Sequence, residues 1–305
     1  MNFAIQTEAP LGDELNRIHY ELITETVALI RPPLDEVHES IHNARKSVKF
    51  LRALVRLLQN PLGPDRYSDY NLGYRDSGRM ISELRDLHVM IIITRYVSRE
   101  AHSVRRQDVE EGITYLEKRE RALLDQARRE NRFEQIVTKL ELFRDRFASD
   151  IEAEIAFPQL LPGLKSVYVQ GRKKYELAAV EDSGGQFHEL RKQAKYLLHC
   201  FQVLSNYWPQ NLDITGTSLQ QLSDYLGEEH DLALFDQLLH DDAFGSRIQR
   251  GNALSSFTTQ KRAHLQRSAL NLAQFVYAKP PEEFIAFFEN LDQEHPDQRD
   301  DVESA

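Results

Sequence analysis

The chain has 305 residues, of which 41% are hydrophobic, so it can form one large or two ordinary domains with a packed core. Its formal net charge of −10 argues against indiscriminate binding to nucleic acid, although a confined basic surface can still attract a polyanion. The single cysteine excludes an internal disulfide, and the lack of a secretion signal or a membrane-length apolar run predicts a soluble, cytoplasmic protein.

Helical periodicity dominates the first half of the chain. A pair of prolines at 32–33 ends the first predicted helix, and the segment NPLGP at 60–64 combines the residues that most often break a helix. No stretch shows the alternation expected of a half-buried strand, so the fold is predicted to be all-α. The predicted helices cover about residues 13–30, 34–59, 71–96, 105–130 and 134–155.

The second of these helices combines a basic stripe with an apolar one. At about 100° per residue, its cations fall on one arc and its large apolar side chains on the neighbouring arc. The basic arc contains His42, Arg45, Lys46, Lys49, Arg52 and Arg56. The apolar arc contains Ile41, Ala44, Val48, Leu51, Val55 and Leu58. In the next predicted helix a polar face holds Arg75, Arg79, Ser82 and Asp86.

A short motif at the start of the basic stripe has a different interpretation. Residues 38–42 match H-E-x-x-H, in which two imidazoles one helical turn apart bind zinc and the glutamate acts as a general base. No later motif supplies a third ligand, and the neighbouring cations would repel a metal ion. A metal-dependent hydrolase built on His38, Glu39 and His42 is therefore the remotest functional hypothesis, and no metal is expected.

The second half of the chain begins after a proline-rich segment at 157–163, which is the best candidate for a boundary. A basic group, Arg172, Lys173 and Lys174, follows it. Gly227 has the place of a residue that closes a helix. The predicted helices cover about residues 186–207, a stretch that ends at Gly227, 229–241, 244–278 and 282–291, and residues 292–305 have the composition of a disordered acidic tail.

The helix 186–207 repeats the pattern of the helix 34–59. Both read H-x-x-R-K-x-x-K-[FY]-L, and Asp86 and Asp231 follow the two histidines at nearly equal distances. The second basic arc contains His188, Arg191, Lys192, Lys195 and His199, and the second apolar arc contains Leu190, Ala194, Leu197, Phe201 and Leu204. This repetition indicates a tandem duplication. Cys200 lies on the apolar side and is expected to fill the core.

The paired motifs, together with RDLHV after the first and LGEEHDLALF after the second, resemble the CHAD family, the conserved histidine α-helical domain, from about residue 10 to 280. The resemblance implies two four-helix bundles, at 10–156 and 163–280, related by a pseudo-two-fold axis around a basic central groove or pore. It also implies binding of inorganic polyphosphate, often at polyphosphate granules, with neither a cofactor nor a catalytic role.

Candidate polyphosphate-binding residues follow from the resemblance and from the polar faces described above. They are His42, Arg45, Lys46, Lys49, Arg52, Arg56, Arg75, Arg79, Arg172, Lys173, His188, Arg191, Lys192 and Lys195. Phe50, Tyr196 and Leu198 stand where the family often has further basic residues, so the lining is thinner here.

The chemistry of a polyphosphate site agrees with these residue types. A linear polyanion without bases requires a track of lysine and arginine donors, and histidines among those cations should have lowered pKa values. Asp86 and Asp231 are expected to orient neighbouring cations or to form structural ion pairs. Nucleic acid is the second hypothesis, because Phe50 and Tyr196 could stack on bases, and another phosphorylated ligand stays open. No nucleophile beside a base and no phosphate loop is seen, so no enzyme activity is expected.

Overall fold

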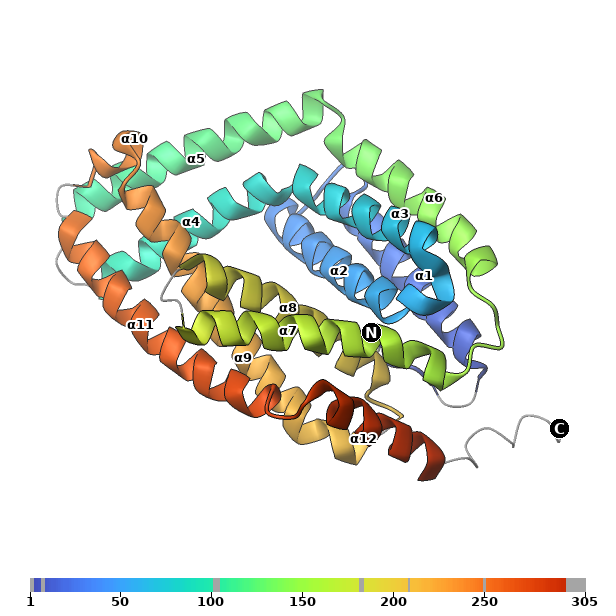
Figure 1. Cartoon of the computed structure of the whole chain (residues 1–305). Helices are drawn as coiled ribbons and strands as arrows, with labels where there is room; N and C mark the ends of the chain where they lie inside the picture. Colours follow the sequence, from blue (N-terminus) through green and yellow to red (C-terminus); the bar gives the residue numbers. More distant parts are fainter. Residues whose placement is uncertain are drawn as a thin grey trace.

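The computed structural model describes residues 3–6, 9–100, 105–180, 184–207, 209–248 and 251–294, and these contain helices and no β-strand (Figure 1). In chain order the elements are α1 (Leu11–Ile30), α2 (Val37–Leu57), α3 (Gln59–Met80), α4 (Ser82–Glu100), α5 (Arg106–Arg129), α6 (Arg132–Asp150), the 3₁₀ helix η1 (Phe157–Leu160), α7 (Leu161–Val180), α8 (Gly184–Leu204), α9 (Pro209–Leu239), α10 (Asp242–Gly245), α11 (Gly251–Val276) and α12 (Pro281–Glu294). The all-α prediction is confirmed. Within these ranges no helix combines the length and apolar character that a membrane crossing requires.

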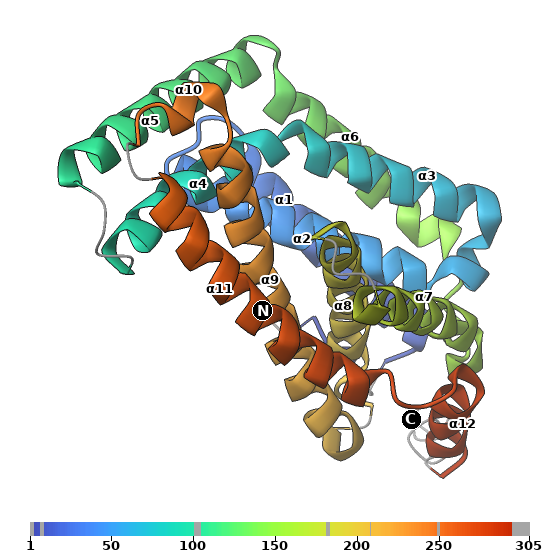
Figure 2. The same ribbon diagram turned by 60° about the vertical axis from the view of Figure 1, so that its left-hand side comes forward.

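The helices form two packed groups that meet at α2, α7 and α8. On one side α1, α2, α3 and α6 pack together, and on the other α7, α8, α9 and α11 do so. The contact between α2 and α8 places the two basic helices side by side at the centre of the molecule (Figures 1 and 2). At one end α4 and α5 lie against α9 to α11, and α12 covers α7.

The hydrophobic core is shared between the two halves of the sequence. The larger cluster of buried side chains runs from Ile5 to Leu291 and includes residues of α2 and of α8. A second cluster joins α4 and α5 to α9, α10 and α11. Since both clusters contain residues from before and after the boundary predicted at 157–163, the halves are packed as one structure, and the pseudo-two-fold arrangement stays a prediction.

The structure corrects one predicted helix in the first half and confirms the break before it. The helix expected at 71–96 is two helices, because α3 begins at Gln59 and ends at Met80, and Ile81 has a non-helical backbone. The predicted break at 60–64 is confirmed within α3, because the backbone of Gly63, with φ of 71° and ψ of 168°, is not helical and α3 is two helical pieces that meet at this kink. The sequence hides the end of α3, since the apolar residues around Ile81 keep helical spacing across it.

The second half differs from the prediction at Gly227, which lies within α9 and does not close a helix. Buried residues continue at helical spacing on both sides of it, from Leu226 to Leu232 and Phe235, and their burial outweighs the modest cost of a glycine in a helix. A short α10 precedes α11, where one helix from 244 to 278 was expected. Helix α12 includes residues 292–294, and the rest of the predicted acidic tail lies outside the described residues.

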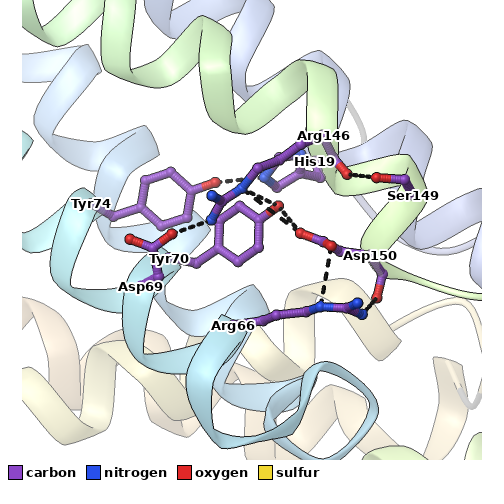
Figure 3. A network of polar contacts seen from close by, with 8 residues as sticks. All are labelled: His19, Arg66, Asp69, Tyr70, Tyr74, Arg146, Ser149 and Asp150. Carbon is purple, nitrogen blue, oxygen red and sulfur yellow. Dashed lines mark hydrogen bonds and ion pairs between the residues drawn. The ribbon is translucent and has the colours of Figure 1, made fainter.

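A polar network ties α1, α3 and α6 together (Figure 3). Tyr70 on α3 donates a hydrogen bond of 2.7 Å to Asp150, and Arg146 on α6 donates to Tyr70 at 3.1 Å and pairs with Asp69. His19 on α1 is buried, shares a hydrogen bond of 2.5 Å with the Tyr74 hydroxyl, and has its pKa lowered by burial to about 3. This network joins α1, α3 and α6 through side chains from all three helices.

A close approach of α7 to the end of α2 gives a test of how the halves are joined. A Cβ atom at Gly163 would lie 2.2 Å from the carbonyl oxygen of Leu57 and 2.5 Å from that of Arg56. Because backbone atoms cannot rotate away, we expect Gly163→Ala to lower the free energy of unfolding by about 1–3 kcal/mol in urea titrations.

Gly216 provides the matched control, since a Cβ there meets no atom within 4 Å on α9. We expect Gly216→Ala to raise the free energy of unfolding by about 0.5–1 kcal/mol, because alanine is the better helix former. Equal effects of the two substitutions would contradict the close packing of α7 on α2.

Candidate functional site

The two basic helices bury their apolar arcs as predicted. On α2 and α8 all of the predicted apolar positions, among them Val48, Leu51, Leu190 and Leu197, are buried. Cys200 on α8 is also buried, with its sulfur 3.8 Å from the carbonyl oxygen of Ala53 on α2, and burial raises its pKa to about 12. Its predicted role as core filling is confirmed, and the contact fixes α8 against α2.

The interface of α2 and α8 brings like charges from both helices together. We define the basic cluster as the half-buried cations whose charges act on one another there, with the imidazoles between them. It consists of Arg45, Lys49, Arg85, Arg191, Lys195, His42, His188 and His230. Arg85 comes from α4 and His230 from α9, so four helices contribute.

Lys49 shows how strongly these charges interact. Its ammonium group is half-buried beside Arg191, Arg45 and Lys195, and burial together with their repulsion lowers its pKa to about 7. The pKa of Lys195 is also lowered, first by burial and then by Arg191. A lysine held this way is on the edge of losing its proton, and a bound anion would favour the charged form.

The imidazoles of the basic cluster are kept neutral. Burial and the charges of Arg85, Lys49, Lys46 and Arg45 lower the pKa of His42.

His188 on α8 follows the same rule. Burial, then Lys192 and Arg191, lower its pKa, so the lowered values predicted for both histidines are confirmed. Its Nδ1 lies 3.2 Å from Nδ1 of His230, whose pKa falls to about 3 because of burial and the nearby Arg191.

Four acids act on the five cations of the basic cluster: Asp86, Asp231 and Glu229 act on Arg191, and Asp224 acts on Lys195. Asp86 lies 3.9 Å from Nη2 of Arg45, too far for a hydrogen bond, while Nη1 of Arg45 donates to the Gly78 carbonyl oxygen at 3.1 Å. Asp231 is half-buried, and burial raises its pKa despite Arg191. Asp86 therefore acts on Arg45 through its charge and not through a hydrogen bond, and the carbonyl oxygen of Gly78 orients the Arg45 side chain.

Further along α2 the arginines are partly occupied by structural contacts. Arg52 and Arg56 both donate to Oδ1 of Asn71, at 3.3 and 2.7 Å. The Arg56 guanidinium also lies 4.0 Å from the ring centre of Tyr196. Tyr196 and Phe50 are themselves buried, so neither ring offers a free face to a base. The stacking that favoured nucleic acid therefore has no exposed platform at these two residues.

Several of the candidate binding residues form ion pairs with acids of their own helices. Arg75 and Arg79 pair with Asp76 at 2.9 and 3.8 Å, and Lys192 pairs with Glu189 at 2.5 Å.

The charge of Lys46 acts on His42 and Lys195 from an exposed position. His199, predicted on the basic arc, is buried, and with Lys46 it lines an open cavity of about 900 Å³ between α1, α2, α8 and α9.

The contacts of Arg172 on α7 do not place the basic group at 172–174 in the basic cluster. Arg172 donates to the Lys279 carbonyl oxygen at 2.6 Å and to Glu176 at 3.0 Å, on the side of α7 that faces α12. Lys173 is exposed on the same helix. Conversely, Arg85 and His230 were missed by the sequence analysis. RDLHV and EEHDLAL contained them, but only the packing of α4 and α9 shows that they meet α2 and α8.

Comparison with known proteins agrees with this architecture. A family model described as the CHAD domain matches residues 20–240. A solved structure, the CHAD domain from the plant Ricinus communis, has a TM-score of 0.66 and 16% sequence identity, covering 92% of this chain and 96% of that chain. At this identity the likeness shows the fold alone. A search of curated proteins found no match.

The repulsion inside the basic cluster should lower the stability of the fold. The unfolded chain binds the Lys49 proton up to pH 10.5, whereas the folded chain releases it near 7, so this lysine costs stability below that range. We expect Lys49→Met to raise the thermal midpoint by roughly 2–4 °C at pH 6, with the gain shrinking as the pH rises towards 10. Differential scanning calorimetry measures both.

Lys118, exposed on α5, is the matched control. We expect Lys118→Met to leave the midpoint nearly unchanged, because surface substitutions have small effects. A lower midpoint for Lys49→Met than for the native chain would show that Lys49 is paired and not repelled.

Proposed function

The chain belongs to the CHAD family, which is associated with polyphosphate-related functions, and from this premise we propose that it binds inorganic polyphosphate, without catalysis, at the basic cluster. The observation that supports this most directly is the lowered pKa of Lys49 among Arg45, Arg191 and Lys195. Half-buried cations that repel one another and lack enough acidic partners require an anion to complete the site.

The geometry suits a long, uniformly charged ligand. Arg45 and Lys49 on α2 and Arg191 and Lys195 on α8 present charge from two sides, and arginine gives forked contacts to phosphate where lysine gives point charges. Arg52 and Arg56 extend the row along α2. We propose that α2 and α8 are equivalent elements of a duplication, and that the phosphate chain runs between them.

Nucleic acid is the weaker alternative, because Phe50 and Tyr196 are buried and cannot stack on bases. A binding role also fits the acids, since Asp86 and Asp231 lie beside cations and have no nucleophile to activate. Association with polyphosphate granules in the cytoplasm would follow from tight binding of long chains.

Charge neutralisation tests the proposal. Binding of long-chain polyphosphate should release counterions, so affinity should fall linearly with salt on logarithmic axes. We expect the Lys49→Gln, Lys195→Gln double variant to weaken binding and to reduce the salt slope by roughly 2, one for each lost contact. Fluorescence anisotropy with labelled polyphosphate in EDTA, with single-stranded DNA and RNA as competitors, measures both quantities.

Lys118 and Lys279 are exposed lysines outside the basic cluster, so Lys118→Gln with Lys279→Gln gives the same change in net charge. We expect this control to keep the native affinity and slope. Equal losses in the two double variants would show that overall charge is responsible, and failure of the native chain to bind polyphosphate at low salt would refute the proposal.

The lowered pKa values predict a pH dependence with two separable parts. Lys49 titrates near 7 in the free chain, and bound polyanion raises that value, so affinity should fall as the pH rises above 7. His42 and His188 are neutral at 7, and their protonation by the bound chain should strengthen binding as the pH falls towards 6.

Two variants separate these contributions. Lys49→Arg keeps its charge at every pH and should flatten the profile above 7, while His42→Ala with His188→Ala should flatten it below 7. His230 titrates near 3 in the free chain, well below this range. Long chains keep the titration of terminal phosphates small. A profile unchanged in both variants would mean that the basic cluster does not meet the ligand.

A further inference from the structure

Three side chains outside the proposed phosphate track meet where α2, α4 and α5 come together. Oε1 of Glu120 on α5 lies 3.0 Å from Nδ1 of His88 on α4 and 3.4 Å from Nδ1 of His38 on α2. The two imidazole rings stack with their centres 3.9 Å apart and their planes 10° from parallel. One ligand atom from each residue lies within 4.8 Å of the other two.

We infer that His38, His88 and Glu120 form a binding site for a divalent transition metal ion, with zinc as the best fit. Bonds of about 2.0–2.1 Å at tetrahedral angles place ligand atoms about 3.3 Å apart, which is close to the two distances observed, although the shorter one is also a hydrogen bond between His88 and Glu120. Because stacked rings direct their in-plane lone pairs parallel to one another, the ring of His38, the most exposed of the three, must turn when an ion binds. Two imidazoles and one carboxylate are a ligand set that zinc accepts with a fourth position left for water.

Burial makes the arrangement more than a chance surface cluster. The side chain of Glu120 is 10% exposed, that of His88 24% and that of His38 42%. In the free chain the Glu120 carboxylate is hydrogen bonded to Nδ1 of His88, and a dication would replace that contact with bonds to all three residues while ordering both rings. Because His38 is the most exposed ligand, the metal would enter from its side.

The site differs from the one that the sequence motif suggested. The H-E-x-x-H pattern pairs His38 with His42 on α2 and assigns Glu39 as a base. In the structure His38 meets His88 from α4, His42 belongs to the basic cluster, and Glu39 is exposed. The missing third ligand is thus supplied by α5, which no local motif could show.

Arg85 is the unfavourable neighbour. It lies one helical turn before His88 on α4, and its charge acts on that imidazole. The carboxylate of Glu120 offsets one positive charge directly at the metal position. We therefore expect affinity in the micromolar range and not the tighter binding of a closed structural zinc site.

The test uses the metal alone, so it is independent of polyphosphate. The full chain is freed of metal with EDTA, dialysed, and titrated with Zn²⁺ in a calorimeter, and with Co²⁺ under visible absorption, which intensifies in tetrahedral coordination. We expect one ion per chain in the native protein. His88→Ala and Glu120→Gln should each weaken Zn²⁺ binding by at least about tenfold, since each removes a ligand or its charge.

Two controls separate this site from its alternatives. His264→Ala changes an exposed histidine on α11 and should bind Zn²⁺ like the native chain. His42→Ala should also bind Zn²⁺ like the native chain. If the H-E-x-x-H motif formed the site, Zn²⁺ binding would require His42 and would not require His88. Loss of binding in His42→Ala with retention in His88→Ala would overturn our assignment, and so would a native chain that binds no Zn²⁺.

A further variant, in which binding produces a new absorption, keeps the proposal testable if His88→Ala or Glu120→Gln folds poorly. His88→Cys places a thiolate at the metal position, so Co²⁺ should produce a sulfur-to-metal charge-transfer absorption that the native chain lacks. Cys200 cannot contribute it, because that thiol is buried and its pKa is raised to about 12. Co²⁺ binding without this absorption would show that residue 88 is not a ligand.

Discussion

The structure depends on the contact between α2 and α8, which joins two helices that carry charge of the same sign. Their apolar arcs, with Val48 and Leu51 on one helix and Leu190 and Leu197 on the other, are fully committed to a shared core. The burial of these arcs holds the cations closer together than their mutual repulsion favours. The pKa of Lys49, lowered to about 7, records the electrostatic cost. The burial of apolar area outweighs this repulsion in the free energy of folding.

The two basic helices differ in how far their rows of cations extend. On α2 the row continues through Arg52 and Arg56, which Asn71 and the ring of Tyr196 hold in place. On α8 the positions that match Arg52 and Arg56 are Leu198, which is buried, and Gln202, which is exposed and uncharged. The row of cations is therefore longer on α2 than on α8, and the ring of Tyr196 on α8 lies against the guanidinium of Arg56 on α2.

Sequence periodicity could predict those features of the structure that depend on one helix alone. It identified both basic helices and the burial of their apolar arcs, because neighbours at 3.6-residue spacing share a face whatever surrounds them. It could not find Arg85, His230, His88 or Glu120, since their roles depend on which helices meet. It also misplaced breaks: Gly227 stays helical because burial continues past it, and Ile81 ends α3 although its apolar neighbours keep the helical pattern.

The metal-binding cluster and the basic cluster share two helices, and this sharing links their electrostatics. His38 and His42 lie one turn apart on α2, as do Arg85 and His88 on α4, so each site is within a turn of the other on both helices. A dication at the first site would add to the positive potential at the second and favour an anion there. Thermodynamic linkage requires the converse, because an anion on the basic cluster would relieve the repulsion between Arg85 and the metal. Binding of a metal ion at one site and of an anion at the other would therefore be cooperative.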